Sequence, residues 1–211
     1  MNRLTDNLES IAGEIRLALA AKDGAREKAL PLCREAIRHS SNAIRAIHRH
    51  EFQRAGELLK SAHNLIDTAE QAVADYSELR YAGFIRDAQK EFAEASITLA
   101  LVRQKQIPDH TELGIEVTAY LNGLGEAVGE LRRYLLDSMR GGDLSQGEEL
   151  LSAMDDIYSV LVSMDFPDAI TSGLRRTTDV VRGILEKTRS DLTLVIRQQA
   201  LENRLGEIEG K

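Results

Sequence analysis

Two pairs of glutamates in the middle of the chain have the spacing of metal ligands on a helix. Glu91 and Glu94 are three residues apart, and Glu126 and Glu130 are four apart. Side chains three or four residues apart lie next to each other on one helix face, close enough to share a cation. Carboxylate oxygens suit Mg²⁺ or Mn²⁺, which can activate a water and neutralise charge on a phosphate. The two pairs therefore indicate a candidate site for phosphodiester chemistry.

The surroundings of Glu91 and Glu94 favour a site over a solvated helix face. On a helical wheel the two glutamates lie between an apolar stripe that includes Phe92 and a second apolar patch at Ile97 and Leu101. Carboxylates flanked by apolar surface are costly to desolvate unless a cation or strong hydrogen bonds compensate. Since the chain holds 34 acidic residues, such pairs also arise by chance, and ordinary helix-face charges remain the alternative interpretation.

The second pair stands in a glycine-rich helix. Glu126 and Glu130 project away from the main apolar stripe of this helix, which by itself predicts exposure to solvent or pairing with Arg133. Three glycines fall within seven residues, at positions 123, 125 and 129. Each interior glycine costs roughly 1 kcal/mol relative to alanine. The glycines therefore predict that a ligand, a helix or a metal site approaches the backbone closely. Neither helix has the Glu-x-x-His motif of a di-iron bundle.

Four arginines form a basic stripe on an earlier helix, opposite Cys33, Ile37, Ile44 and Ile47. They are Arg34, Arg38, Arg45 and Arg49. Such a row can follow a phosphate backbone, although the solvated face of an amphipathic helix is the alternative interpretation. Cys33 and His48 border the apolar face, and we expect both to be packed residues rather than catalytic ones.

Long helices must position these side chains, because the composition favours helices over strands. Of the 211 residues 43% are hydrophobic, with no Trp and three prolines, and periodicity at helical spacing runs almost unbroken. Turn signals divide it into an all-α, up-and-down bundle of about seven long helices within a single domain, residues 1–211. The expected helices are residues 2–21, 25–50, 53–75, 81–104, 111–140, 144–163 and 169–205.

Composition also limits the partners and the compartment. An aromatic content of 4% argues against recognition by base stacking, and the net charge of −7 argues against simple polyanion binding unless the basic residues gather locally. One cysteine excludes an internal disulfide and multi-cysteine metal sites. With no signal-peptide pattern and no apolar run long enough for a bilayer, we expect a cytoplasmic protein without membrane contact.

Several segments together resemble the translin superfamily, and within it the Trax branch, which supplies the catalytic type of subunit to the RNA-processing complex C3PO. The resemblance covers most of the chain and is most specific at residues 120–133. The other similar segments are residues 34–49, residues 89–95, the pair Gly142 and Asp143, and residues 174–196.

The resemblance implies a seven-helix translin-like fold, a hollow octamer-like homo-oligomer and Mg²⁺-dependent endonucleolytic cleavage of RNA inside the shell. Glu91 and Glu94 match the paired catalytic glutamates of the family, and Glu126 matches a third catalytic acid that is usually Asp in Trax. The extra methylene can shift the metal geometry but retains the carboxylate. Translin, the non-catalytic relative, has an apolar residue at this position, whereas both branches share Glu130.

We therefore expect a metal-dependent endoribonuclease in which Glu91, Glu94 and Glu126 bind Mg²⁺ or Mn²⁺. Glu130 is expected to support them as a further metal ligand, while Arg34, Arg38, Arg45 and Arg49 hold RNA phosphates. The alternative is a non-catalytic, translin-like protein that binds single-stranded RNA or DNA. A third interpretation is a helical scaffold that binds neither metal nor nucleic acid.

Overall fold

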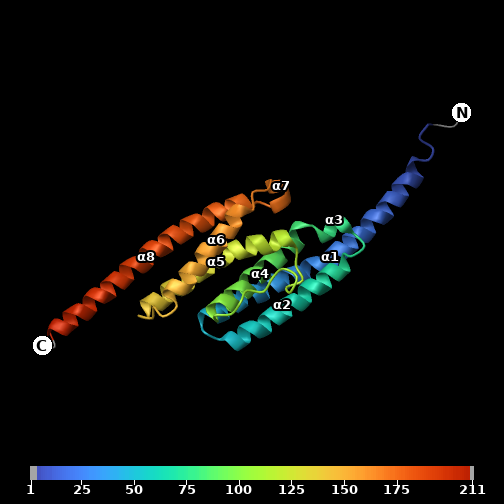
Figure 1. Ribbon diagram of the computed structural model, residues 1–211. Helices are drawn as coiled ribbons and strands as arrows, with labels where there is room; N and C mark the ends of the chain where they lie inside the picture. Colours follow the sequence, from blue (N-terminus) through green and yellow to red (C-terminus); the bar gives the residue numbers. More distant parts are fainter. Residues whose placement is uncertain (1–3, 210–211) are drawn as a thin grey trace.

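The structure, a computed structural model, describes residues 4–209 and contains six long helices and two of four residues within that range (Figure 1). The helices are α1 (Leu8–His48), α2 (Phe52–Ala72), α3 (Ser77–Arg80), α4 (Gly83–Val102), α5 (Val117–Arg140), α6 (Gly147–Ser163), α7 (Asp168–Thr171) and α8 (Leu174–Glu209). The described residues contain no strand. The prediction of an all-α bundle of long helices is confirmed.

The helices pack as successive neighbours around one apolar core. Helix α1 packs against α2 and α4, α4 against α5, and both α5 and α6 against α8. Buried alanines repeat every seven residues on α1, at Ala29, Ala36 and Ala43, and on α2, at Ala55, Ala62 and Ala69. This repeat gives each helix a continuous narrow seam, and the small side chains let the two backbones approach closely. The first part of α1 and the last part of α8 project from opposite ends of the bundle (Figure 1).

The expected break at Asp23 and Gly24 is wrong, because α1 runs without interruption through both residues and through Pro31. A Cβ added at Gly24 would meet nothing within 4 Å, so this glycine faces open space. One exposed glycine costs only about 1 kcal/mol relative to alanine, which a helix anchored along its length can absorb. The expected start at residue 2 lies outside the described residues.

Two other expected boundaries are also wrong. Helix α5 begins at Val117 instead of residue 111, because the Asp109 carboxylate accepts hydrogen bonds from the backbone of Thr111 and Glu112 at 2.8 Å and holds a turn there. The expected helix at 169–205 is split into α7 and α8 by Ser172 and Gly173, whose φ angles are 54° and 85°. Both angles are left-handed and therefore end a right-handed helix.

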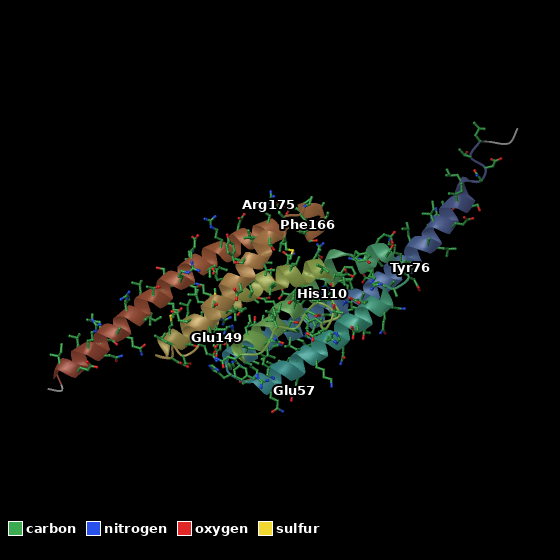
Figure 2. The ribbon with its side chains drawn as sticks, in the orientation of Figure 1. Glu57, Tyr76, His110, Glu149, Phe166 and Arg175 are labelled. Carbon is green, nitrogen blue, oxygen red and sulfur yellow. The ribbon has the colours of Figure 1, made fainter. Side chains whose placement is uncertain are left out.

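The remaining expected helices agree with α2, α4 and α6 to within a few residues, and the expected turn before α4 contains the short helix α3. In Figure 2, Phe166 marks the approach to the α7–α8 turn and His110 marks the loop between α4 and α5. No helix in the described part of the chain is long and apolar enough to cross a membrane. That residues 1–211 form a single domain stays a prediction.

Candidate metal centre and the cleft beside it

Three of the predicted site residues meet between α4 and α5. Glu91, Glu94 and Glu126 each place a carboxylate oxygen within 4.8 Å of the other two. Glu94 is 9% exposed, and the side chains of Glu91 and Glu126 are 27% and 36% exposed. The group, here called the acidic cluster, is therefore open on one side and desolvated on the other.

Gly123 explains why the two helices bring these carboxylates together. A Cβ at this position would lie 2.7 Å from the Ala93 Cβ and 2.7 Å from the Lys90 carbonyl oxygen. Helix α5 therefore crosses α4 in backbone contact at the level of the α4 glutamates, and Glu126 follows one turn later on α5. The predicted close neighbour of the glycines is a helix, at least at this position.

Gly125 makes a second close approach, and Gly129 makes none. A Cβ at Gly125 would overlap the Thr177 methyl group of α8, whereas the nearest atom to one at Gly129, on Ile184, is 3.9 Å away. Two of the three glycines thus fit α5 between α4 and α8, while the third has room for a methyl group.

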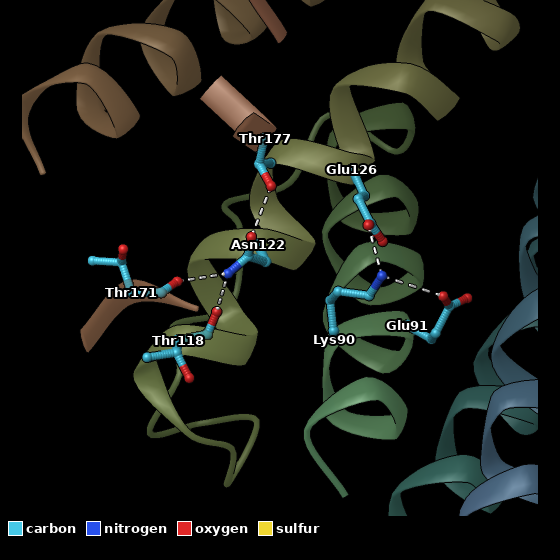
Figure 3. Close-up of polar contacts among 7 residues, drawn as sticks. All are labelled: Lys90, Glu91, Thr118, Asn122, Glu126, Thr171 and Thr177. Atoms are coloured by element: carbon cyan, nitrogen blue, oxygen red, sulfur yellow. Dashed lines mark hydrogen bonds and ion pairs between the residues drawn. The ribbon is translucent and has the colours of Figure 1, made fainter. Parts of the chain in front are cut away.

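Lys90 supplies a positive charge inside the acidic cluster. Its Nζ lies 2.6 Å from Glu126 Oε1 and 3.7 Å from Glu91 Oε1 (Figure 3). Burial by itself lowers the pKa of the ammonium, but the hydrogen bond and the charge of Glu126 outweigh it, so the pKa lies above its usual value. The ammonium therefore stays charged and stands where a bound cation would be attracted. Lys90 was not predicted as a site residue.

The pKa values of the α4 glutamates show the cost of crowding buried carboxylates. Burial, together with the charges of Glu91 and Glu126, raises the pKa of Glu94 to about 8. Burial also raises the pKa of Glu91, an effect that the neighbouring Lys90 charge reduces. Glu94 thus retains a proton at neutral pH in the metal-free protein, and a divalent cation that binds there must displace it.

The raised pKa of Glu94 predicts how stability depends on pH. In EDTA, the folded protein holds a proton that the unfolded chain releases above about pH 4.5, so the free energy of unfolding should fall between pH 4.5 and 8. Glu94→Gln should remove the part of this loss that Glu94 contributes. The variant should then be more stable than wild type at pH 9, by on the order of 1.4 kcal/mol per unit of pKa shift. Urea unfolding at pH 5 and pH 9 measures the difference.

The matched control is Glu148→Gln, which changes an exposed glutamate in the first turn of α6. It should leave the pH dependence as in wild type. If Glu94→Gln also followed the wild-type curve, Glu94 would titrate at an ordinary pKa.

Glu130 lies beside the acidic cluster and outside the group of three oxygens. Its Oε2 is 2.5 Å from His48 Nε2 on α1 and 3.7 Å from an Arg133 nitrogen. Its charge contributes to the raised pKa of Glu94, so it is near enough to act on the site electrostatically. Its assignment as a metal ligand stays a prediction.

His48 and Cys33 are packed residues, as predicted. The side chain of His48 is 7% exposed, and Cys33 is 2% exposed. Burial, assisted by the charge of Glu70, raises the pKa of the Cys33 thiol to about 11. A thiol with this pKa is protonated at neutral pH and is a poor nucleophile.

The basic stripe of Arg34, Arg38, Arg45 and Arg49 is exposed along α1, while Cys33, Ile44 and Ile47 on the opposite face are buried. Arg38 pairs with Glu35 at 3.0 Å, and Arg45 donates to Asn42 at 3.4 Å. Arg34 and Arg49 make no ion pair with residues 4–209. His48 stands between Arg45 and Arg49 and contacts Glu130, so this end of the stripe approaches α5 near the acidic cluster.

A cleft of about 640 Å³ opens from the acidic cluster between α4, α5 and α8. Lys90, Glu94 and Glu126 line one part of it, and Arg86, Ser172 and Arg176 line another. Arg86, Lys90 and Glu94 are spaced by four residues and therefore follow one face of α4 along the cleft. The two arginines were not predicted, because only the fold brings them beside the acidic cluster.

Asn122 lines this cleft and is held by three hydrogen bonds. Its Nδ2 donates to the carbonyl oxygens of Thr118 at 2.9 Å and Thr171 at 3.1 Å, and its Oδ1 accepts from Thr177 Oγ1 at 2.8 Å (Figure 3). The residue is 7% exposed. One buried amide thus ties α5 to α7 and to the start of α8. Asn122 was not predicted as a site residue, because its burial follows only from the packing of α5 against α7 and α8.

No protein-family model matches the chain. An uncharacterized protein of Methanocaldococcus jannaschii is 32% identical over 197 residues, which cover 90% of this chain and 85% of that protein. The solved structures of AfC3PO, alone and in a complex with duplex RNA, align with a TM-score of 0.81 at 34% identity, over 90% of this chain and 98% of theirs.

The structure of apo-NeC3PO shares the fold at a TM-score of 0.76 and 20% identity, over 92% of this chain and 100% of that chain. The fold and these relatives define an all-α protein of the translin type. The chain belongs to the translin superfamily, represented among these relatives by the C3PO proteins.

Proposed function

We propose that the protein is a Trax-like, metal-dependent endoribonuclease in which Glu91, Glu94 and Glu126 hold Mg²⁺ or Mn²⁺. The observation that carries the proposal is the approach of three carboxylate oxygens from two helices to within 4.8 Å, at the edge of a cleft. A bound divalent cation would supply an activated water and would neutralise charge on the phosphate.

The residues present fit such a cation. Carboxylate oxygens are the ligands that Mg²⁺ prefers, and three of them leave coordination positions for water and a phosphate oxygen. The position of Lys90 Nζ, 2.6 Å from Glu126, indicates that the cluster attracts positive charge. The high pKa of Glu94 points the same way, because a carboxylate crowded by others gains most from a cation.

The side chains around the cluster have separable roles in this proposal. Glu94 would hold the cation as a carboxylate and would release its proton to solvent, and Lys90, which contacts Glu126, would be placed to bind the phosphate that enters the cleft. Glu130 acts as a further ligand or holds the α1 side of the site through His48. Asn122 holds α5, α7 and the start of α8 together along the cleft.

RNA is the proposed substrate, because the AfC3PO relative was solved with duplex RNA. Single-stranded DNA is a further candidate ligand. The exposed stripe of Arg34, Arg38, Arg45 and Arg49 would hold phosphates without reading the sequence, since guanidinium contacts to the backbone do not depend on the base.

Arg45→Gln together with Arg49→Gln should weaken RNA binding equally for different sequences. The slope of log affinity against log salt should flatten by about 0.7 for each phosphate of a single strand that the variant no longer binds. Fluorescence anisotropy in EDTA, at several salt concentrations, measures both quantities. The control replaces two exposed arginines that lie outside the stripe and outside the projecting helix ends, Arg140 and Arg182. If the two double variants lost the same RNA affinity, the stripe would contribute only general surface charge and would not be a binding site for phosphates.

A non-catalytic RNA-binding or DNA-binding protein is the second candidate, favoured by the ion pair of Lys90 and Glu126, which already satisfies one of the three carboxylates. Labelled RNA incubated with the purified protein, with Mg²⁺ or with EDTA, separates the two. Cleavage that requires Mg²⁺ supports the endoribonuclease. Binding without cleavage supports the second candidate, and the absence of both supports a scaffold.

An octamer-like homo-oligomer is part of the proposal. The projecting start of α1 exposes Leu8, Ile11 and Ile15 at 58%, 43% and 53%, and the far end of α8 exposes Leu201 and Leu205 at 58% and 50%. Apolar side chains at helical spacing on unpartnered helix ends are typical of surfaces that a second copy covers. Light scattering should give a mass several times the 23.4 kDa of one chain, and a monomer at micromolar concentration would contradict it.

A further inference from the structure

We infer that Arg86 and Arg176 form a phosphate subsite in the cleft, which holds the nucleic-acid strand on one side of the scissile bond. The inference rests on the proposed function, because the scissile phosphate is placed at the acidic cluster. It adds a second basic contact, on the α8 side of the site, to the basic stripe on α1.

Two separate elements bring the arginines to the same cleft. Arg86 is on α4, eight residues before Glu94, and the helical rise places it about 12 Å along the axis from that glutamate. Arg176 is in the first turn of α8. Both line the cleft that Lys90, Glu94 and Glu126 also line. The cleft therefore has a carboxylate end and a guanidinium end.

Arg86 is held in place without being neutralised. Its guanidinium donates to Ser172 Oγ at 3.1 Å, and a hydroxyl carries no charge to offset it. Ser172 is fixed in turn by its left-handed backbone and by the hydrogen bond from Asn122 to the neighbouring Thr171 carbonyl. A half-buried guanidinium positioned in this way loses little conformational entropy when it binds a phosphate.

Arg176 has no carboxylate partner among residues 4–209, unlike three other arginines of α8. Arg175 pairs with Asp165 at 3.8 Å, Arg182 with Glu186 at 3.1 Å and Arg189 with Asp155 at 2.9 Å. Within residues 4–209 neither Arg176 nor Arg86 makes an ion pair. Two unpaired guanidinium groups facing one cleft are therefore available to an anionic ligand.

A phosphodiester strand is the ligand class that fits a cleft with a negatively charged carboxylate end and a positively charged guanidinium end. The carboxylates repel the strand unless a cation intervenes, whereas guanidinium groups bind phosphate oxygens in a bidentate way. Asp87, the remaining acidic residue of the cleft lining, is exposed and is one position from Arg86. With the basic stripe approaching from α1, the strand would cross the acidic cluster between two basic contacts.

The test uses a double variant that carries both Arg86→Gln and Arg176→Gln. Its RNA affinity is compared with that of the single variant Arg175→Gln. Glutamine at position 86 removes the guanidinium charge but stays polar, and Arg175 is the neighbouring arginine that does not line the cleft. The probe is a fluorescein-labelled single-stranded RNA in Ca²⁺, a hard cation that can offset the carboxylates, and the RNA is checked for intact length after each titration. The double variant should bind at least about tenfold more weakly, with the salt slope reduced by about 1.4, while Arg175→Gln binds as wild type.

Arg176→Gln alone should show part of the loss of RNA affinity. Because position 176 is exposed, this single variant can replace the double variant in the test if the double variant is unstable.

Wild-type affinity in the double variant, or a loss matched by Arg175→Gln, would overturn the subsite. Failure of the proposed function can be told apart from failure of the subsite. In that case the wild-type protein would show no Mg²⁺-dependent cleavage of RNA, independently of the affinities measured for these variants. Cleavage with an unchanged KM in the double variant would overturn the subsite alone.

Discussion

Glu91→Gln or Glu94→Gln is expected to abolish Mg²⁺-dependent RNA cleavage while the protein stays folded. Each change replaces a charged oxygen ligand of the acidic cluster with a neutral amide of nearly equal size. Loss of residues that only support metal ligands reduces activity by 10-fold to 100-fold, so loss of a ligand should exceed about 100-fold. The rate at saturating RNA and Mg²⁺ measures the effect, since binding alone cannot restore it.

Two comparisons separate this expectation from general damage. Glu94→Gln should unfold at a higher urea concentration than wild type above neutral pH, because one of several crowded carboxylates is gone. Glu148→Gln, at an exposed position in the first turn of α6, should retain the wild-type rate. If the variants at positions 91 and 94 cleaved RNA at the wild-type rate, the acidic cluster would be a group of structural charges.

Gly123→Ala is expected to destabilise the protein and to weaken its affinity for divalent cations. The added Cβ would lie 2.7 Å from a backbone oxygen of α4, so the two helices must separate. Overpacking of this kind costs about 1–3 kcal/mol, more than the roughly 1 kcal/mol that alanine gains over glycine in a helix. Separation also moves Glu126 away from Glu91 and Glu94. Urea unfolding and Mn²⁺ titration measure the two effects.

Gly129→Ala is the matched control on the same helix. The nearest atom to its Cβ would be 3.9 Å away, an ordinary contact, so the variant should gain about 0.5–1 kcal/mol from helix propensity and keep its metal affinity. Equal stability changes at positions 123 and 129 would contradict the close approach of α4 and α5.

The acidic cluster illustrates how much of the site could be predicted from the sequence. The apolar residues on both sides of Glu91 and Glu94 predict partial burial, and the structure confirms it. The glycines of α5 predict a close neighbour, which is α4 at Gly123 and α8 at Gly125. The helical wheel placed Glu126 away from the core, however, and only the crossing of the two helices brings it to the α4 glutamates.

Residues that depend on the tertiary arrangement were beyond sequence reasoning. Lys90 is an ordinary helix-face lysine until α5 places Glu126 2.6 Å away, and Arg86 becomes a cleft residue only through the α7–α8 turn. The same limit explains the errors in the helix boundaries. Gly24 carries a turn signal but faces open space on a long anchored helix, whereas Ser172 and Gly173 do end a helix.

Anomalous diffraction from crystals soaked in Mn²⁺ tests the central claim most directly, because it locates the cation without relying on activity. We predict a peak between the carboxylates of Glu91, Glu94 and Glu126, with Lys90 Nζ displaced from its contact with Glu126. The peak should be absent in Glu94→Gln crystals soaked in the same way. A peak elsewhere, or none at this position at a Mn²⁺ concentration that supports RNA cleavage, would contradict the assignment of the acidic cluster as the metal centre.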